Sequence, residues 1–207
     1  MITYESLYDA LIKILKLLLL YSVSRSITAV VHRLDRPKPG ETEVITRVLR
    51  LANEAIRNGA SSVDEKGINL AVESRQGGIT QVYRLKQFWN GFPLHQHQVI
   101  VHKRGDDTKL LGTFVTGIGQ ALKDVDVKAC DPQKKLKEVQ SRPEFRDAFK
   151  FIDEKASVKV YIAEKDGSDK ADVYLVCHVT FAALLRGAPP LMADYLIDCK
   201  TGKIFES

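Results

Sequence analysis

The fold of this chain is decided by residues 83–94, YRLKQFWNGFPL, together with residues 98–102, QVIVH. In both runs aromatic and aliphatic residues alternate with polar ones, which is typical of strands that have one buried face. Asn90-Gly91 separates the two runs, and Asn-Gly is a preferred sequence for a two-residue hairpin turn. The stretch therefore predicts a strand, a tight turn and a second strand.

Alternation divides the side chains of this hairpin between two faces. The face able to cover a hydrophobic layer carries Tyr83, Leu85, Gln87 and Trp89. Arg84 lies on the opposite face, where it could anchor an acidic partner. We expect it to form an ion pair within the chain in preference to that contact.

The segments around the hairpin extend it into a meander. Alternating runs cover residues 68–73, 80–89, 96–102 and 109–118, with tight turns between them. This pattern predicts successive antiparallel strands. Before them, a break at residues 37–40, PKPG, is followed by apolar residues at helical spacing, which predicts a helix over residues 41–58.

A second set of elements begins near residue 120, where the composition changes. Asp131 as N-cap and Pro132 in the first turn predict a helix over residues 133–140. A second short helix is expected over residues 141–151. Strands are predicted over residues 157–164, 171–183 and 191–198, before a turn at Thr201-Gly202.

These elements predict an α+β protein made of two helix-plus-antiparallel-meander halves, each cystatin-like, packed in tandem. The expected segments are 1–36, 37–120 and 121–207. The first is interpreted either as a retained amphipathic helix over residues 4–21 or as a degenerate signal peptide ending near residue 29. Its longest fully apolar run, residues 17–20, is too short to cross a bilayer.

Composition indicates a soluble globular protein of 207 residues with a net charge of +5. The basic residues are dispersed and lack interleaved aromatic residues, which argues against a nucleic-acid binder and favours mild attraction to an acidic protein surface. Cys130, Cys177 and Cys199 are too dispersed in the sequence for zinc-ligand pairs. One disulfide with a free thiol and three buried thiols both fit this count.

The sequence contains no recognisable catalytic motif. None of the five histidines is followed by glutamate, so the His-Glu-x-x-His site of zinc proteases is absent. His95 and His97 would share one face of a regular strand, but no third ligand accompanies them, so we interpret them as a polar hairpin face. Cys177 and His178 are adjacent in a strand and point to opposite faces, which excludes a dyad between them. We therefore expect no enzyme activity, no metal site and no cofactor.

Two separated segments resemble the propeptide region of thermolysin-like zinc metalloproteases. The hairpin resembles the signature of the fungalysin/thermolysin propeptide domain through Arg84, Gln87, Trp89, Gly91 and Pro93. Residues 193–204, ADYLIDCKTGKI, resemble the closing strand-turn-strand of the PepSY domain, with Asp198, Thr201 and Gly202 at its turn. The resemblance covers roughly residues 38–207 and includes no catalytic domain.

This resemblance implies a non-catalytic inhibitor and folding chaperone of a thermolysin-like zinc metalloprotease, acting in cis or in trans outside the cytoplasm. It also implies that the C-terminal residues enter the protease cleft; here these are Ile204, Phe205, Glu206 and Ser207. The alternatives are a stand-alone peptide-binding module of PepSY type and the N-terminal fragment of a protease precursor. No nucleic acid and no stable membrane span are expected.

Overall fold

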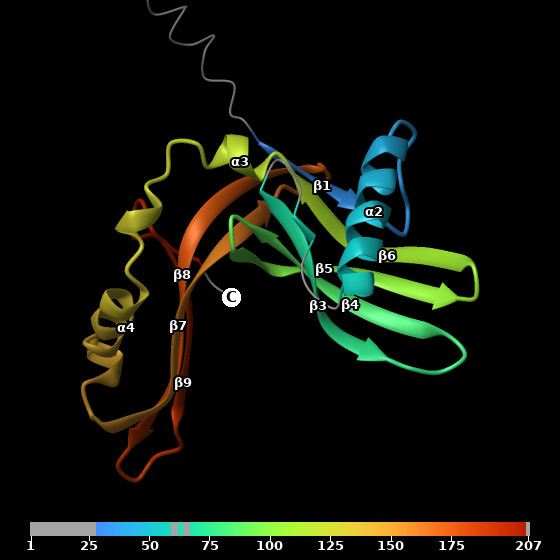
Figure 1. Ribbon diagram of the computed structural model, residues 1–207. Helices are drawn as coiled ribbons and strands as arrows, with labels where there is room; N and C mark the ends of the chain where they lie inside the picture. Colours follow the sequence, from blue (N-terminus) through green and yellow to red (C-terminus); the bar gives the residue numbers. More distant parts are fainter. Residues whose placement is uncertain (1–27, 59–61, 64–66, 206–207) are drawn as a thin grey trace, which may run out of the picture.

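The computed structural model describes residues 28–58, 62–63 and 67–205 (Figure 1). Both interpretations of residues 4–21 fall outside the described residues. The strands are β1 (Ala29–Arg33), β2 (Ser62–Val63), β3 (Ile68–Gln76), β4 (Gln81–Trp89), β5 (Phe92–Arg104), β6 (Asp107–Thr116), β7 (Ala148–Glu164), β8 (Lys170–Leu185), β9 (Leu191–Asp198) and β10 (Ile204–Phe205). The α-helices are α2 (Thr42–Asn58), α3 (Ile118–Ala121) and α4 (Pro132–Gln140).

The predicted hairpin is confirmed as the centre of the first meander. β4 and β5 pair antiparallel on either side of Asn90 and Gly91, whose φ angles are 47° and 83°. Two positive φ angles in a two-residue loop suit the right-handed twist of the flanking strands. β3 pairs with the outer side of β4, and β6 with β5, so the expected order of four antiparallel strands is present.

The helix predicted over residues 41–58 is confirmed as α2, which covers one face of this meander (Figure 1). Its buried residues are Val48, Leu51, Ala52 and Ala55. They face the buried side of β3 and β4, where Leu70 and Leu85 are fully buried. The burial of apolar surface between helix and sheet is the main stabilisation of this layer, and it contributes about 25 cal/mol for each Å2 that is buried.

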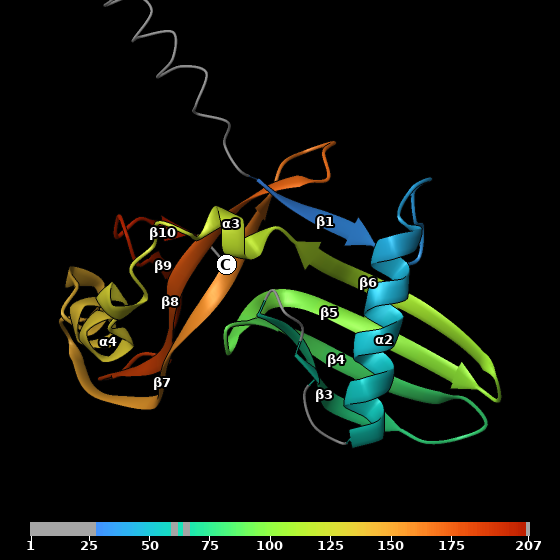
Figure 2. The same ribbon diagram turned by 45° about the horizontal axis from the view of Figure 1, so that its top comes forward.

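A second layer consists of α4 packed on β7 and β8 (Figure 2), and β9 contributes Ala193 and Ile197 to the core beneath it. The Asp131 carboxylate caps α4 by accepting a hydrogen bond from the Lys134 backbone N–H at 3.0 Å, as predicted. The helix expected over residues 141–151 is wrong. A single 3₁₀ turn, Pro143–Phe145, is followed by β7, in which Phe151 pairs with Ala183 and packs its ring 5.3 Å from that of Phe181. Cross-strand aromatic packing explains this outcome.

The predicted fold class, two cystatin-like helix-plus-meander halves, is wrong, because the described chain is mostly one antiparallel sheet with few helices. All ten described strands belong to this sheet. β1 is hydrogen-bonded to β6 and also to β8, through Val31↔Val115 and Ala29↔Ala171. β5 pairs in parallel with β7 at Leu94↔Val160.

Strands from both the earlier and the later segment also contribute to one hydrophobic core. Val160 and Leu175, from β7 and β8, belong to the core cluster that contains the buried face of α2. Strands of the later segment therefore complete the core of the earlier one. The expected boundary between segments 37–120 and 121–207 falls in α3, and that division stays a prediction. Within the described residues, no helix is long and apolar enough to cross a membrane.

Candidate functional site

Gln87 of the motif hairpin is a polar residue with a structural role in the buried core. Its side chain is fully buried, its Nε2 donates to the Val115 carbonyl at 2.7 Å, and its Oε1 accepts from the Val115 N–H at 2.9 Å. Val115 lies where β6 has left β5 to pair with β1. The amide of Gln87 therefore takes the place of a missing strand for one buried peptide group.

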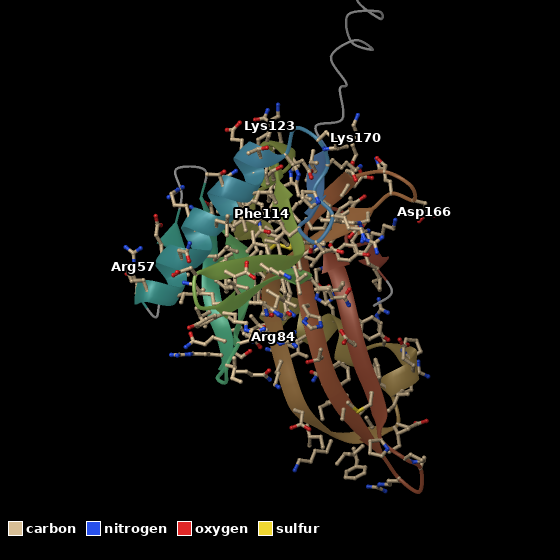
Figure 3. All side chains as sticks on the ribbon, turned by 90° about the vertical axis from the view of Figure 1, so that its right-hand side faces the viewer. Arg57, Arg84, Phe114, Lys123, Asp166 and Lys170 are labelled. Carbon is tan, nitrogen blue, oxygen red and sulfur yellow. A yellow bond between two sulfur atoms is a disulfide. The ribbon has the colours of Figure 1, made fainter. Side chains whose placement is uncertain are left out.

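The remaining hairpin residues divide between core and surface. Trp89 is buried, and Pro93 stands second in β5, where its missing N–H is tolerated. Arg84 is exposed on the side of β4 away from α2 (Figure 3). Among the described residues it has no ion-pair partner, so the expected internal ion pair is not found there.

The closing turn is built around the carboxylate of Asp198. The residue is buried, and its side chain accepts hydrogen bonds from the backbone N–H groups of Lys200 and Thr201, both at 3.2 Å, and from the Thr201 hydroxyl. Gly202 has a φ angle of 72° and donates its N–H to the Asp198 carbonyl at 2.9 Å. The Asp-x-x-Thr-Gly pattern is thus explained by local turn chemistry.

The C-terminal strand lies at one edge of the sheet. Ile204 pairs with Ile197, and Phe205 pairs with Leu196. The Phe205 ring packs 4.8 Å from the ring of Tyr161 and 4.7 Å from that of Tyr174. Glu206 and Ser207, the other two residues expected to enter a protease cleft, lie outside the described residues.

A strained position in β5 directs the two neighbouring histidines to different surroundings. Gln96 has a φ angle of 61°, in the left-handed region, which interrupts the alternation of the strand. His97 is buried, with its Nδ1 2.9 Å from the Thr113 hydroxyl, whereas the ring of His95 lies 5.5 Å from that of His178 on β8. The expectation that both imidazoles line one polar hairpin face is therefore wrong.

His95 lies in an electrostatically unusual environment. Its Nε2 atom is buried and has no hydrogen-bond partner among the described residues. Desolvation, reinforced by the nearby positive charge of Lys159, lowers the pKa of His95 to about 4. Burial and the neighbouring Lys86 also lower the pKa of Lys159. His178 Nε2 lies 2.7 Å from the Asp194 carboxylate, so this pair borders His95 on one side.

The three cysteines, distant in the sequence, converge in the structure. Cys130 and Cys199 form a disulfide, and the free thiol of Cys177 lies 3.8 Å from the sulfur of Cys199. This is one of the two arrangements that the cysteine count allows. Burial raises the pKa of Cys177 to about 11, which keeps it a thiol at neutral pH. Cys177 and His178 point to different sides of β8, as predicted, and do not form a dyad.

Sequence reasoning missed both of these clusters. In the part of the chain that the structure describes, the three cysteines are the only group of three or more His, Cys, Asp or Glu side chains close enough to share a metal ion. The proximity of His178 to Asp194 could have been predicted from the turn at residues 186–190, RGAPP, because this turn pairs β8 with β9. No local signal places Cys130 beside them.

Comparisons with known proteins provide no family. No family model matches the sequence, and no curated protein matches it. The chain is similar to the crystal structure of an uncharacterized protein from Eubacterium rectale, with 13% identity and a TM-score of 0.35. The similarity covers 78% of this chain and 55% of that protein, so the chain spans about half the length of its neighbour. At this TM-score the similarity carries no argument about function.

Proposed function

We propose that this chain is a non-catalytic inhibitor and folding chaperone of a thermolysin-like zinc metalloprotease. The two motif segments, at residues 83–94 and 193–204, are the starting point for this proposal. The observation that carries it further is the C-terminal strand β10, which is only two residues long and lies at a sheet edge. A short extended strand at a sheet edge suits transfer into a partner's cleft.

The energetics of β10 favour such a transfer. Two residue pairs and a half-buried ring hold this strand to its own sheet, a contribution on the order of 1–2 kcal/mol. A Phe side chain that fills an apolar pocket of a partner contributes about 2–4 kcal/mol. In the proposed complex, Phe205 exchanges its contacts with Tyr161 and Tyr174 for a protease pocket.

Charge and cysteine chemistry also support the proposal. Arg84 is exposed and has no ion-pair partner among the described residues, so its guanidinium is available to an acidic partner surface. The net charge of +5 favours encounter with such a surface. The disulfide between Cys130 and Cys199 supports the proposed secreted or periplasmic location, since such bonds persist in oxidising compartments.

The proposal is tested by titrating the purified chain against thermolysin and by refolding denatured thermolysin in its presence. We expect stoichiometric inhibition and a higher refolding yield. Deletion of residues 203–207 should weaken inhibition by about tenfold or more, because the cleft loses its anchor. Phe205→Ala should reproduce much of this loss without shortening the chain.

Lys200→Ala serves as the matched control, because Lys200 is exposed in the same turn and lies outside β10. It should inhibit like the unmodified chain. An inhibition constant that does not change on deletion of residues 203–207 would discard cleft insertion. A chain that neither inhibits thermolysin nor raises its refolding yield would discard the whole proposal.

A second candidate, a stand-alone peptide-binding module, is favoured by the free edge of β9. Among the described strands, β10 alone covers this edge, at Leu196 and Ile197, and Met192, further along it, is 72% exposed. An unpaired strand edge with exposed apolar side chains is suited to capture of an extended peptide. Met192→Asp should abolish peptide capture at this edge and leave inhibition of thermolysin unchanged, which separates the two candidates.

A further inference from the structure

The sulfur atoms of Cys130, Cys177 and Cys199 form one compact group. All three lie within 4.8 Å of one another. They come from three different places in the fold: the residue before the N-cap of α4, the middle of β8, and the residue after β9. Cys130 and Cys199 are half-buried and Cys177 is fully buried.

Main-chain hydrogen bonds hold these positions independently of the disulfide. Cys199 donates its N–H to the Leu175 carbonyl at 2.9 Å, which continues the pairing of β8 and β9 by one step. Cys177 pairs with Ile197 in the same ladder, so Cys177 and Cys199 lie on one face of it. Cys130 donates its N–H to the Val127 carbonyl at 3.2 Å, in a turn that leads into α4. It is held near the sheet by the packing of Leu136 and Val139 of α4 against β8.

The three sulfurs therefore stay close when the disulfide is reduced. Reduction by a phosphine breaks the bond between the two sulfur atoms, converts Cys130 and Cys199 to thiols with two protons from water, and leaves the phosphine oxide. Three thiolate ligands around one ion, with metal–sulfur bonds of about 2.3 Å, require sulfur separations of roughly 4 Å. The sulfurs of Cys177 and Cys199, at 3.8 Å, already meet that requirement, and once the disulfide is reduced Cys130 has to move away from Cys199 to a similar separation.

We propose that the chain with this bridge reduced binds one soft metal ion, Zn2+ or Cd2+, through Cys130, Cys177 and Cys199. Thiolates are the ligands that such ions prefer over carboxylate or carbonyl oxygens. Binding releases three thiol protons, and it is mutually exclusive with the disulfide. Within the described residues no fourth His, Cys, Asp or Glu joins the group, so one coordination position is left to water.

The surroundings of the group suit a bound cation. The half-buried Cys130 and Cys199 give an ion a route to the buried Cys177. The redox state of Cys130 and Cys199 then decides whether the chain can bind the ion. Oxidation forms the disulfide, and reduction frees the thiols that form the metal site.

The test uses the full chain, reduced by a phosphine without oxygen and titrated with Cd2+. We expect one Cd2+ per chain by native mass spectrometry, with ultraviolet thiolate-to-cadmium charge-transfer absorption that reaches a plateau at one equivalent. Cys177→Ser should weaken Cd2+ binding at least tenfold and reduce the absorption per ion, because one of three sulfur ligands is lost.

The oxidised chain is the matched control, because it keeps Cys177 but has no other free thiol, and it should bind Cd2+ at least tenfold more weakly. If reduction unfolds the chain, recovery of the far-ultraviolet circular dichroism spectrum with one equivalent of Cd2+ supports the site, and failure to recover contradicts it. The proposal is overturned if the reduced chain binds no Cd2+, or if Cys177→Ser binds it as tightly. None of these measurements requires a protease partner.

Discussion

At the scale of single residues, the chain uses buried polar side chains in place of missing main-chain partners. Gln87 is the main example, because its amide satisfies both the N–H and the carbonyl of Val115 where β6 separates from β5. An unsatisfied buried peptide group costs about 1–3 kcal/mol, so such a side chain is hard to replace. This explains the glutamine in an otherwise apolar row.

Gln87→Leu should lower the free energy of unfolding by about 2–4 kcal/mol, because Leu fills the space but leaves the Val115 peptide group without partners. Urea denaturation measures the change. Arg84→Gln is the matched control on the same strand, and as an exposed substitution it should change the free energy of unfolding by less than about 0.5 kcal/mol. Equal effects of the two substitutions would refute the role of Gln87.

The protonation of His95 makes the stability of the chain depend on pH. Its pKa in the folded chain is about 4, below the ordinary value of 6.5, because burial and Lys159 disfavour the charged ring. As the pH falls from about 6.5 towards 4, the unfolded chain therefore takes up a proton that the folded chain does not. Stability should decrease over that range.

We expect the free energy of unfolding to be about 1 kcal/mol lower at pH 5 than at pH 7 because of His95 alone. This figure allows for the partial exposure of the ring to solvent. His95→Phe should remove this part of the pH dependence and leave the part due to other groups. Urea denaturation of both proteins at the two pH values gives the comparison. An identical decrease in both would show that His95 does not titrate in this way.

At the scale of elements, β10 depends on the turn that precedes it. The Asp198 carboxylate accepts three hydrogen bonds within that turn, and the residue's N–H donates to the Lys203 carbonyl at 2.8 Å. These contacts bring the chain back to the edge of β9. A two-residue strand has little stability of its own, so its position follows from the turn.

Asp198→Ala should lower the free energy of unfolding by about 1–2 kcal/mol and increase hydrogen exchange at residues 203–205 by more than elsewhere. The turn loses the carboxylate that holds Lys200 and Thr201, so β10 detaches first. Hydrogen exchange followed by mass spectrometry localises the effect. Lys200→Ala, in the same turn, should leave exchange unchanged, and a uniform increase along the chain would contradict the local role of Asp198.

At the scale of the whole molecule, two long strands connect the layers. β7 and β8 contribute Val160 and Leu175 to the core beneath α2, and their other ends contribute Phe151 and Phe181 to the core beneath α4 (Figures 1 and 2). Because the same strands enter both cores, disruption of one core removes support from the other.

We therefore expect the chain to unfold in a single cooperative transition. Trp89 is the only tryptophan and is buried in the first core, so its fluorescence reports that core alone. Far-ultraviolet circular dichroism reports all strands, and the two signals should have the same denaturant midpoint. Separate midpoints would show that segments 37–120 and 121–207 unfold independently.

Sequence patterns were most informative where the structure is decided locally. The Asn90-Gly91 turn, the buried row of β4, α2 and the Asp131 cap were each predictable from turn chemistry, periodicity or capping. The helix expected over residues 141–151 failed because Phe151 was placed by a cross-strand contact with Phe181. Such a contact depends on a strand thirty residues away.

The candidate site was less predictable for the same reason. Asp198 and Gly202 do form the turn that the sequence predicts, since turn chemistry is local, and their part in a functional site stays a prediction. The surroundings of His95 depend on the left-handed conformation of Gln96 and on the parallel pairing of β5 with β7. Neither feature leaves a pattern in the sequence around His95.

The positions of the turns, the capped helix and the amphipathic strands can be read from the amino-acid sequence, because they depend on neighbouring residues. The pairing of β1 with both β6 and β8, and the meeting of Cys130 with Cys177 and Cys199, are visible in the three-dimensional fold alone. Local sequence does not encode them, because every strand edge presents the same N–H and carbonyl groups. Which edges pair is therefore selected by the packing of the whole core, and the grouping of distant side chains follows from that pairing.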